Sequence, residues 1–319
     1  MTVLAPPSVA EPTVTRTAGS ARASKTAPYA FLAPALILFA AFLAAPIAYT
    51  AYLSLRRVKV SGLGLGAGSR TEVWAGLSNY GRSLSDPDFL PSVGRIGLYG
   101  LIVVPIMLGL ALLMALLLDA RRTRVDGFAK TAIFLPYAVP AVVASLLWGF
   151  LYLPRISPLA DLLTGLGLPV PNVFASSAVL YAVANIAIWG GIGFNMIVLY
   201  TALTAVPTSL YEAARIDGAS EWQIAWRIKI PMVLPSLIMT FVFSLIATLQ
   251  VFAEPMTLRP LSNTISATWT PLMKVYRDAF TRNDIHAAAA TSVIIAVAAF
   301  AISFGFLKLV GSRAFRQED

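Results

Sequence analysis

Residues 211–235 read YEAARIDGASEWQIAWRIKIPMVLP and lie between two long apolar segments of the chain. Six charged residues alternate here with bulky apolar ones. The charged residues are Glu212, Arg215, Asp217, Glu221, Arg227 and Lys229, and the apolar ones among them are Trp222, Ile224, Trp226 and Ile228. So many charges are too costly for a segment that crosses a bilayer. The stretch is therefore predicted to be an amphipathic loop between two membrane spans.

The composition of the whole chain is that of a membrane protein. Of 319 residues, 58% are hydrophobic and 12% are charged, whereas a soluble domain carries about 25% charge. The absence of cysteine excludes disulfides, thiolate metal sites and cysteine nucleophiles, and one histidine, His286, is too few for a zinc or di-iron site. The net charge of +9 comes from Lys and Arg at segment ends, which suits lipid headgroups and not nucleic acid.

Six segments are long and apolar enough to span the bilayer. A charge at the bilayer centre costs about 2.5–3.5 kcal/mol, and a spanning helix needs about 20 apolar residues. The segments run approximately over 29–55, 96–118, 131–153, 178–206, 232–253 and 287–307. We therefore expect an all-α polytopic membrane protein with a six-helix domain over 29–310. Residues 1–28, rich in Ala, Thr, Ser and Pro, are expected to be a disordered tail, and 311–319 a C-terminal tail.

The spans offer no energy source of their own. No Asp, Glu, Lys or Arg lies near the middle of any of them, whereas ion-coupled carriers, proton relays and voltage sensors need such groups. The chain also lacks GxxxxGK[ST], and its glycine-rich run GLGLGAGS at 62–69 is expected to be a flexible loop. A self-powered secondary carrier or channel is the alternative from a different class, and a membrane enzyme or scaffold is a third. Both are disfavoured, and we expect no catalytic residue and no metal.

The loop after the fourth span contains two short helices by sequence. Pro207 closes the span, Thr208 or Ser209 can cap the first helix, and Glu212 is expected in its first turn, where an acid suits the helix dipole. Gly218 ends this helix, because the chain must turn there, and Ser220 can cap the second.

The second helix is apolar on more than one side. Trp222 with Trp226 and Ile224 with Ile228 form two pairs at the i, i+4 spacing, and the two pairs point to different sides. A helix of this kind needs two surfaces to bury against. One can be the ends of the chain's own spans, and the other should be a partner protein. The alternative is an amphipathic loop at the membrane interface without a partner.

These residues resemble the signature loop of ABC importer permeases. That pattern is Glu-Ala-Ala, three residues, Gly, nine residues, Ile, one residue and then usually Leu-Pro. The matching positions are Glu212, Ala213, Ala214, Gly218, Ile228 and Pro231. Ile230 stands where Leu is commoner, which conserves volume.

The resemblance extends over about 29–310 and is most similar to the carbohydrate-uptake branch, in particular to the larger membrane subunit of maltose-type transporters. It is carried also by GLSNYGRSLSDPDF at 76–89, KTAIFLPYAVPAVVASLLW at 130–148 and YRDAFTRNDIHAAAA at 276–290. The branch usually has Gly-Gly-Pro after the fifth span, and this chain has RPLSNTISATWTPL at 259–272 instead. The conformation of that outer loop is therefore not predicted by the resemblance.

The resemblance implies an ATP-driven importer in which this chain is one of several subunits. A second permease completes the pathway, two cytoplasmic ATPase subunits bind ATP and Mg, and an extracytoplasmic solute-binding protein delivers the substrate. The chain itself is expected to hold no cofactor. Loop 207–231 would be the cytoplasmic coupling element, which places both termini in the cytoplasm of a bacterial inner membrane; charge counts on the two faces do not settle this orientation. Asp217 and Trp222 are added to the matching residues as expected ATPase contacts.

The resemblance also implies a substrate pathway for a sugar or oligosaccharide. Its expected residues are Tyr137, Gly191, Phe194, Ser244 and Thr248, with Gln250 as a further polar candidate. Ser244 and Thr248 are four residues apart and share one helical face. Sugars need hydrogen-bonding groups and an aromatic face but no charge. Packing roles for these residues stay open, as do glycerol phosphate, amino-sugar or polyamine substrates, although a phosphorylated substrate calls for cationic groups that the spans lack.

Overall fold

A computed structural model describes residues 27–60, 70–120 and 126–314, in two compact units formed by residues 1–49 and 50–319. The first unit contains helix α1 (Ala27–Phe39), the π-helical turn η1 (Ala40–Ala44) and the start of α2 (Ala45–Ser54). Together they form the apolar stretch 29–54, which confirms the first predicted span. Most of the predicted tail 1–28, the glycine-rich run 62–69 and residues 315–319 lie outside the described residues.

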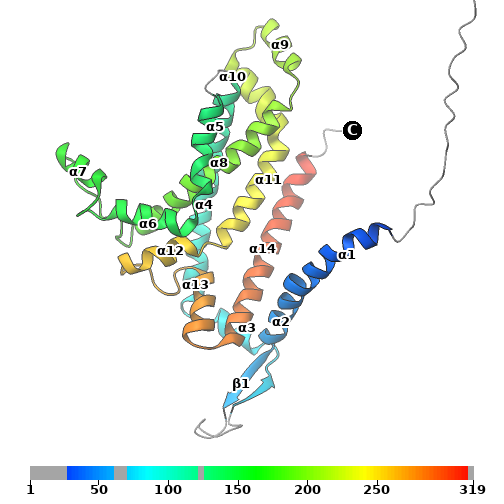
Figure 1. Ribbon diagram of the computed structural model, residues 1–319, viewed down its shortest axis with the longest axis vertical. Helices are drawn as coiled ribbons and strands as arrows, with labels where there is room; N and C mark the ends of the chain where they lie inside the picture. Colours follow the sequence, from blue (N-terminus) through cyan, green and yellow to red (C-terminus); the bar gives the residue numbers. More distant parts are fainter. Residues whose placement is uncertain (1–26, 61–69, 121–125, 315–319) are drawn as a thin grey trace, which may run out of the picture. The chain divides into compact units, whose positions relative to one another are not determined.

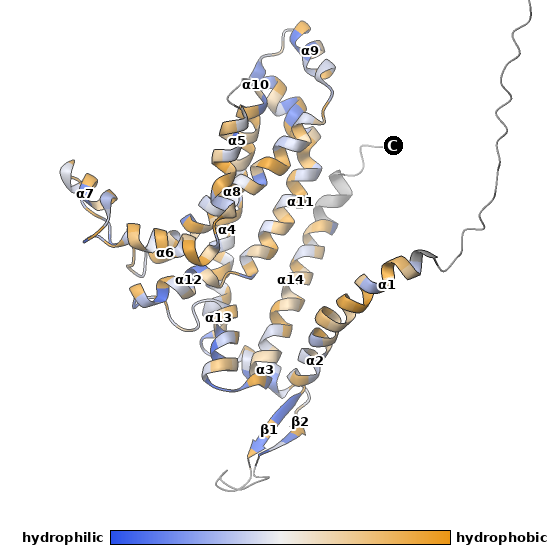
Figure 2. Cartoon of the chain, viewed as in Figure 1, coloured by the Kyte–Doolittle hydropathy of each residue, from blue (hydrophilic) through white to orange (hydrophobic). Residues whose placement is uncertain are grey.

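The second unit holds four long apolar helices. They are α4 (Phe89–Ala120), α8 (Val179–Thr204), α11 (Ile230–Leu249) and α14 (Ile285–Ala314). With the first span, five helices of the described chain are long and apolar enough to cross a membrane, and one bent pair makes a sixth. Hydrophobic residues cover much of these helices, whereas strand β1 is largely hydrophilic (Figure 2). The expected all-α polytopic class is confirmed.

The core of this unit lies between α4 and α8. Tyr99 and Val103 of α4 and Val183 of α8 are buried in one cluster, and Ala111 and Ala115 pack with Met196 and Leu199 in another. Small residues on α4 bring the two helix backbones close together, as expected for helices that associate without a hydrophobic driving force in lipid.

The third predicted span, 131–153, is not one helix, and the prediction was wrong on this point. Helix α5 (Asp126–Phe134) leads into the 3₁₀ turn η2 (Leu135–Ala138), and α6 (Ala141–Tyr152) follows at an angle of 95° to the first part. Pro136 and Pro140 cause the break, because proline removes a helical donor and disfavours helix in the residue before it. Val139, directly before Pro140, is extended.

The remaining elements lie at the two ends of the long helices. At one end are α9 (Thr208–Ile216), α10 (Glu221–Ile224) and the π-helical turn η3 (Ala225–Lys229). Near the opposite end are α3 (Ser78–Leu84), α13 (Pro271–Tyr276) with η5 (Arg277–Thr281), and a hairpin of β1 (Arg56–Val60) and β2 (Arg70–Trp74) (Figure 1). Helices α7 (Pro158–Gly165) and α12 (Ala253–Leu258), with η4 (Arg259–Leu261), follow α6 and α11.

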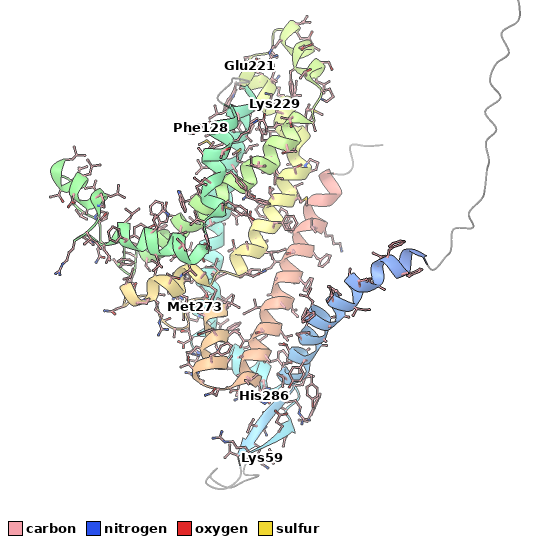
Figure 3. The ribbon with its side chains drawn as sticks, in the orientation of Figure 1. Lys59, Phe128, Glu221, Lys229, Met273 and His286 are labelled. Atoms are coloured by element: carbon pink, nitrogen blue, oxygen red, sulfur yellow. The ribbon has the colours of Figure 1, made fainter. Side chains whose placement is uncertain are left out.

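The antiparallel hairpin was not anticipated. Its strands pair Arg56 with Trp74 and Val60 with Arg70. Asn79 of α3 holds its base, since its amide donates to the carbonyls of Ser54 at 2.7 Å and Arg56 at 2.6 Å. Glu221 and Lys229 are labelled at one end of this unit in Figure 3, and Met273 and His286 near the other. The loop 207–231 therefore lies at the opposite end of this unit from the hairpin and α13.

Candidate functional site

The turn between α9 and α10 is built as the sequence predicts. Gly218 has a φ of +82°, and a Cβ atom at this position would meet nothing within 4 Å. Backbone conformation and not space therefore requires glycine here. Ser220 caps α10 in a capping box: its hydroxyl accepts from the Gln223 backbone N–H, and its own N–H donates to the Gln223 side chain at 2.8 Å.

Two details of the first helix differ from the prediction. Pro207 occupies the N-cap position of α9, so neither Thr208 nor Ser209 caps it with a side chain. The helix consequently starts at Thr208, and Glu212 lies beyond its first turn, where the helix dipole acts weakly. Glu212 is exposed. Its side chain is available for a partner and does not stabilise the start of α9.

The two apolar pairs of the second helix do face different sides. Ile224 is fully buried and packs with Val206 and Tyr211, and Ile228 lies against this cluster. Trp222 and Trp226 are 71% and 55% exposed, with ring centroids 5.6 Å apart. The Ile side packs inside the loop, against Tyr211 of α9 and against Val206 just after α8, and the Trp pair presents an apolar surface outward. Of the other predicted contact residues, Glu212, Ala213, Asp217, Gly218 and Pro231 are exposed and Ala214 is half-buried.

The second loop helix is continuous with the fifth span. Helix α10 passes through η3 into α11 without a break. Pro231 stands in the first turn of α11, just after the π-helical turn η3, in which the Ile230 N–H donates to the Ala225 carbonyl five residues back. The sequence had separated a loop helix from a span that begins at residue 232. In the structure the loop is instead a direct extension of α11.

A buried ion pair fixes this extension to the end of α4. Lys229 Nζ lies 2.5 Å from Asp119 Oδ2, and the two side chains are only 6% and 5% exposed. The same ammonium lies 4.8 Å from the centre of the Tyr211 ring of α9. Lys229 of η3 therefore contacts both α4 and α9, directly before the start of α11.

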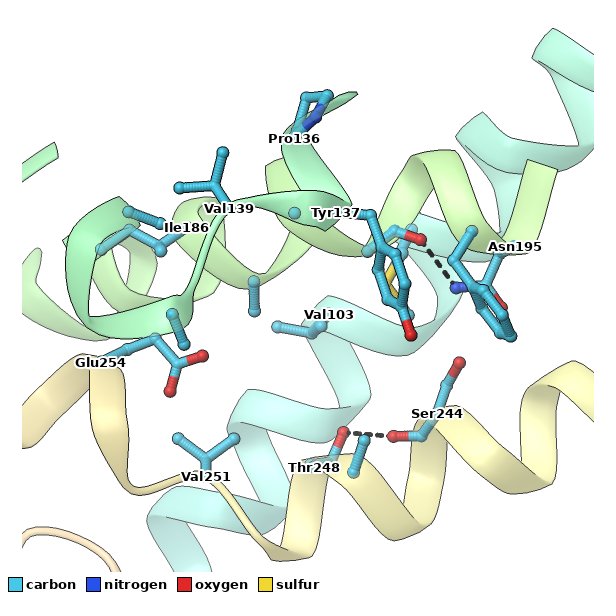
Figure 4. Close-up of a pocket in the computed structure, with 18 of the residues that line it drawn as sticks. Val103, Pro136, Tyr137, Val139, Ile186, Asn195, Ser244, Thr248, Val251 and Glu254 are labelled. Carbon is cyan, nitrogen blue, oxygen red and sulfur yellow. Dashed lines mark hydrogen bonds between the residues drawn. The ribbon is translucent and has the colours of Figure 1, made fainter. Parts of the chain in front are cut away.

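A cavity of about 610 Å³ lies within the helix bundle. It is lined from α4, the bent segment around η2, α8, α11 and α12 (Figure 4). Tyr137 and Phe194 stack with ring centroids 4.9 Å apart. Five of the six predicted pathway residues line it: Tyr137, Gly191, Phe194, Ser244 and Thr248.

Gln250, the further polar candidate for the pathway, does not line this cavity. Helix α11 ends at Leu249, and Gln250 caps it with non-helical backbone angles and an exposed side chain. The helical spacing that groups Ser244 with Thr248 therefore cannot be continued to Gln250. The chain turns there, and Val251 and Glu254 reach the cavity instead.

Two polar residues of the cavity were missed by the sequence analysis. Asn195 follows Phe194 directly on α8, and Glu254 stands in the first turn of α12. Asn195 is a polar side chain in a largely apolar helix, and this feature of the sequence could have indicated it as a pathway residue. Glu254 lies one residue beyond the predicted fifth span, 232–253, and only the turn at Gln250 brings it inward.

The close approach of the bent segment to α8 depends on Gly193. A Cβ atom there would lie 2.7 Å from Phe134 Cα, which no side chain tolerates. Gly193 thus lets α8 contact the backbone at the end of α5. This contact places Tyr137 over the cavity.

Comparison with known proteins gives the family. Residues 107–316 match the model described as "Binding-protein-dependent transport system inner membrane component". The chain belongs to this family. It is a multi-pass membrane permease, the transport subunit and not the catalytic subunit of a binding-protein-dependent ABC importer.

Individual relatives of this permease carry different substrate names. The chain is 30% identical over 293 residues to the sn-glycerol-3-phosphate transport system permease protein UgpA of Agrobacterium fabrum, covering 91% of this chain and 96% of that one. It is 29% identical over 249 residues to the diacetylchitobiose uptake system permease protein NgcF of Streptomyces coelicolor, covering 74% of this chain and 69% of that one.

The fold of the permease also matches a solved structure. A chain of a bacterial ABC transporter involved in the import of the acidic polysaccharide alginate superposes with a TM-score of 0.75 at 21% identity, covering 90% of this chain and 95% of that one. At this identity the likeness concerns the fold.

Proposed function

We propose that this permease moves a sugar or oligosaccharide inward through the cavity between α4, α8 and α11, using ATP that partner subunits hydrolyse. The observation that carries the substrate class is the lining of the cavity. An aromatic pair, Tyr137 and Phe194, lies beside the neutral hydrogen-bonding groups of Asn195, Ser244 and Thr248. Sugars bind through stacking on aromatic faces and through hydroxyl hydrogen bonds, and this arrangement offers both.

The loop 207–231 is the part of the permease that meets the ATPase in this proposal. Its exposed Trp222 and Trp226, with the exposed Glu212 of α9, supply an apolar and charged surface for a groove on the partner. Because η3 runs directly into α11, a movement of the loop moves Ser244 and Thr248 as well. Closure of the ATPase dimer would thereby reach the cavity through one rigid helix.

The remaining subunits follow from this role. A second permease completes the pathway, two cytoplasmic ATPase subunits bind ATP and Mg, and an extracytoplasmic solute-binding protein presents the sugar to the other end. No nucleic acid is involved. The loop then faces the cytoplasm of a bacterial inner membrane, and both termini lie on the same side as the loop.

Uptake by the assembled transporter tests this function. Each of Tyr137→Ala, Phe194→Ala, Ser244→Ala and Thr248→Ala should lower uptake of the transported sugar, by about tenfold for the aromatic pair, equivalent to about 1.4 kcal/mol. Phe300→Ala removes an exposed aromatic ring of α14 outside the cavity and should leave uptake unchanged. Unchanged uptake and substrate preference in all four cavity variants would show that the substrate site lies elsewhere, for example in the partner permease.

A further inference from the structure

Glu254 is the one charged side chain among the residues that the structure shows lining the cavity. Figure 4 shows its carboxylate directed into the same space as Tyr137, Asn195 and Ser244. The residue is half-buried and forms no ion pair with any described part of the chain. The more deeply buried carboxylates of Asp119 and Asp278 differ in this respect, because each lies 2.5 Å from a lysine ammonium.

An unpaired carboxylate in such a place dominates the potential of the cavity. The walls are largely apolar side chains, so the charge is screened less than on the protein surface. Clefts with one sign of charge and low-dielectric walls concentrate ions of the opposite sign and repel those of the same sign. The cavity should therefore attract cations and exclude anions.

Two neutral polar groups of the cavity, Asn195 and Thr248, also offer acceptors to a solute, whereas the hydroxyls of Tyr137 and Ser244 can donate as well. The Asn195 amide nitrogen already donates to the Gly191 carbonyl at 2.9 Å, which leaves its Oδ1 free to accept. Thr248 Oγ1 donates to the Ser244 carbonyl at 2.9 Å, which leaves the lone pairs of Oγ1 free to accept a hydrogen bond (Figure 4). Phosphate and carboxylate groups bring only acceptors to such a site, whereas hydroxyls and ammonium groups bring donors.

We propose that Glu254 makes the cavity select against anionic solutes, so that it accepts hydroxyl-bearing solutes that are neutral or carry an amine and rejects phosphate esters and uronates. This proposal rests on the function proposed above for the cavity. Its substrate class differs from that in the name of UgpA, the relative from Agrobacterium fabrum. One residue of α12 then sets the charge that the pathway admits.

The natural absence of cysteine allows a direct test. Ala247 lines the cavity and is exposed to it, so Ala247→Cys introduces a single small reporter. The complete transporter, with ATP and binding protein, is labelled at pH 8 with two methanethiosulfonate reagents, a cationic one that carries trimethylammonium and an anionic one that carries sulfonate. The labelling rate of each reagent on this chain is measured by mass spectrometry. For Ala247→Cys, the labelling rate of the cationic reagent is divided by that of the anionic reagent. This ratio should be about tenfold higher than the same ratio for the exposed loop variant Ser209→Cys.

Replacing the charge should remove this preference. Glu254→Gln combined with Ala247→Cys should lower the ratio about tenfold, and Glu254→Asp should retain it. The matched control is Asp161→Asn, which removes an exposed carboxylate of α7 outside the cavity and should leave the ratio unchanged. An unchanged ratio in Glu254→Gln, or failure of both reagents to label Cys at position 247, would overturn the proposal.

Sugar uptake separates this proposal from the function on which it rests. If Glu254→Gln lowers the labelling ratio but no neutral or amine-bearing sugar is taken up by the unmodified transporter, then the sugar function fails and the anion exclusion stands. If sugars are taken up normally and the ratio does not change, only the role of Glu254 fails.

Discussion

Gly218 is the residue on which the shape of loop 207–231 depends. Its positive φ turns the chain between α9 and α10, and the Arg215–Glu221 ion pair of 2.7 Å spans this turn. Open space surrounds the position, so a substitution acts through the backbone and not through a clash. The orientation of Trp222 and Trp226 relative to α9 therefore follows from one backbone conformation.

We expect Gly218→Val to weaken ATPase attachment or to uncouple ATP hydrolysis from uptake while the spans insert normally. A side chain with Cβ costs about 1–2 kcal/mol in this conformation, and a β-branched one fits worst. Gly218→Asn is the matched control, because Asn tolerates positive φ, and Glu212→Ala should have a milder effect than Val. ATPase retention, binding-protein-stimulated hydrolysis and uptake are measured on the purified complex. Normal values of all three for Gly218→Val would exclude this loop as the coupling element.

At the scale of elements, the helix formed by α10, η3 and α11 joins the loop to the cavity. Lys229 lies at the end of η3, directly before α11, and is held by Asp119 of α4 and by the Tyr211 ring of α9. A buried pair of this kind adds little over apolar packing, but the loss of one partner leaves a charge that the interior cannot solvate. The pair therefore fixes the position of the loop relative to α4.

The single variants Lys229→Met and Asp119→Asn should each lower the stability of the permease by about 3–5 kcal/mol. The double variant Lys229→Met with Asp119→Leu should lose much less than the sum, since it leaves no charge unpaired. The stability of each variant is measured by heating the detergent-purified permease and following its loss by size-exclusion chromatography. Arg215→Met, which removes one partner of the exposed Arg215–Glu221 pair, is the control and should change melting little. Additive losses in the double variant would show that the two charges act independently.

At the scale of the whole molecule, a second ionic cluster holds the end of the unit opposite the loop. Lys274 is buried between Asp86 at 3.0 Å and Asp278 at 2.5 Å, and Arg277 lies 2.9 Å from Asp88. The cluster ties the link between α3 and α4 to α13 and η5. Burial by itself raises the pKa of Asp86, but hydrogen bonds from the Asp88 backbone and Lys274, together with the charges of Lys274 and Arg277, bring its pKa below the ordinary value.

This lowered pKa predicts the direction of the response to acid. The Asp86 carboxylate contributes its full stability above its unfolded pKa of about 3.9, and this contribution is lost as pH falls through the lower pKa of the folded state. Melting temperature should therefore fall below about pH 4, and Asp86→Asn should melt lower at neutral pH with a shallower acid slope. Asp161→Asn, outside the cluster, should retain the parent slope. An equal acid slope in the parent and in Asp86→Asn would contradict this assignment.

The sequence by itself determined the features that depend on local composition and spacing. Long apolar segments must be helical in lipid, because every backbone group has to be satisfied within the segment. Five of the six predicted segments are found as long helices in the described chain, and the third is found as a bent pair of helices. The turn at Gly218, the Ser220 cap and the opposite faces of the Trp and Ile pairs also follow from residues within one or two helical turns. The five pathway residues that line the cavity were named through the resemblance and not through spacing.

Tertiary structure decided the features that depend on residues far apart in the chain. The 95° bend of the third span is held where Gly193 of α8 admits the backbone of α5, and the Lys229–Asp119 pair joins positions 110 residues apart. Gln250 was named as a further polar candidate for the pathway, but α11 ends one residue earlier and the turn brings Glu254 inward instead. Helical periodicity cannot fix the residue at which a helix stops or what faces it across a cavity, because both are set by packing against other segments.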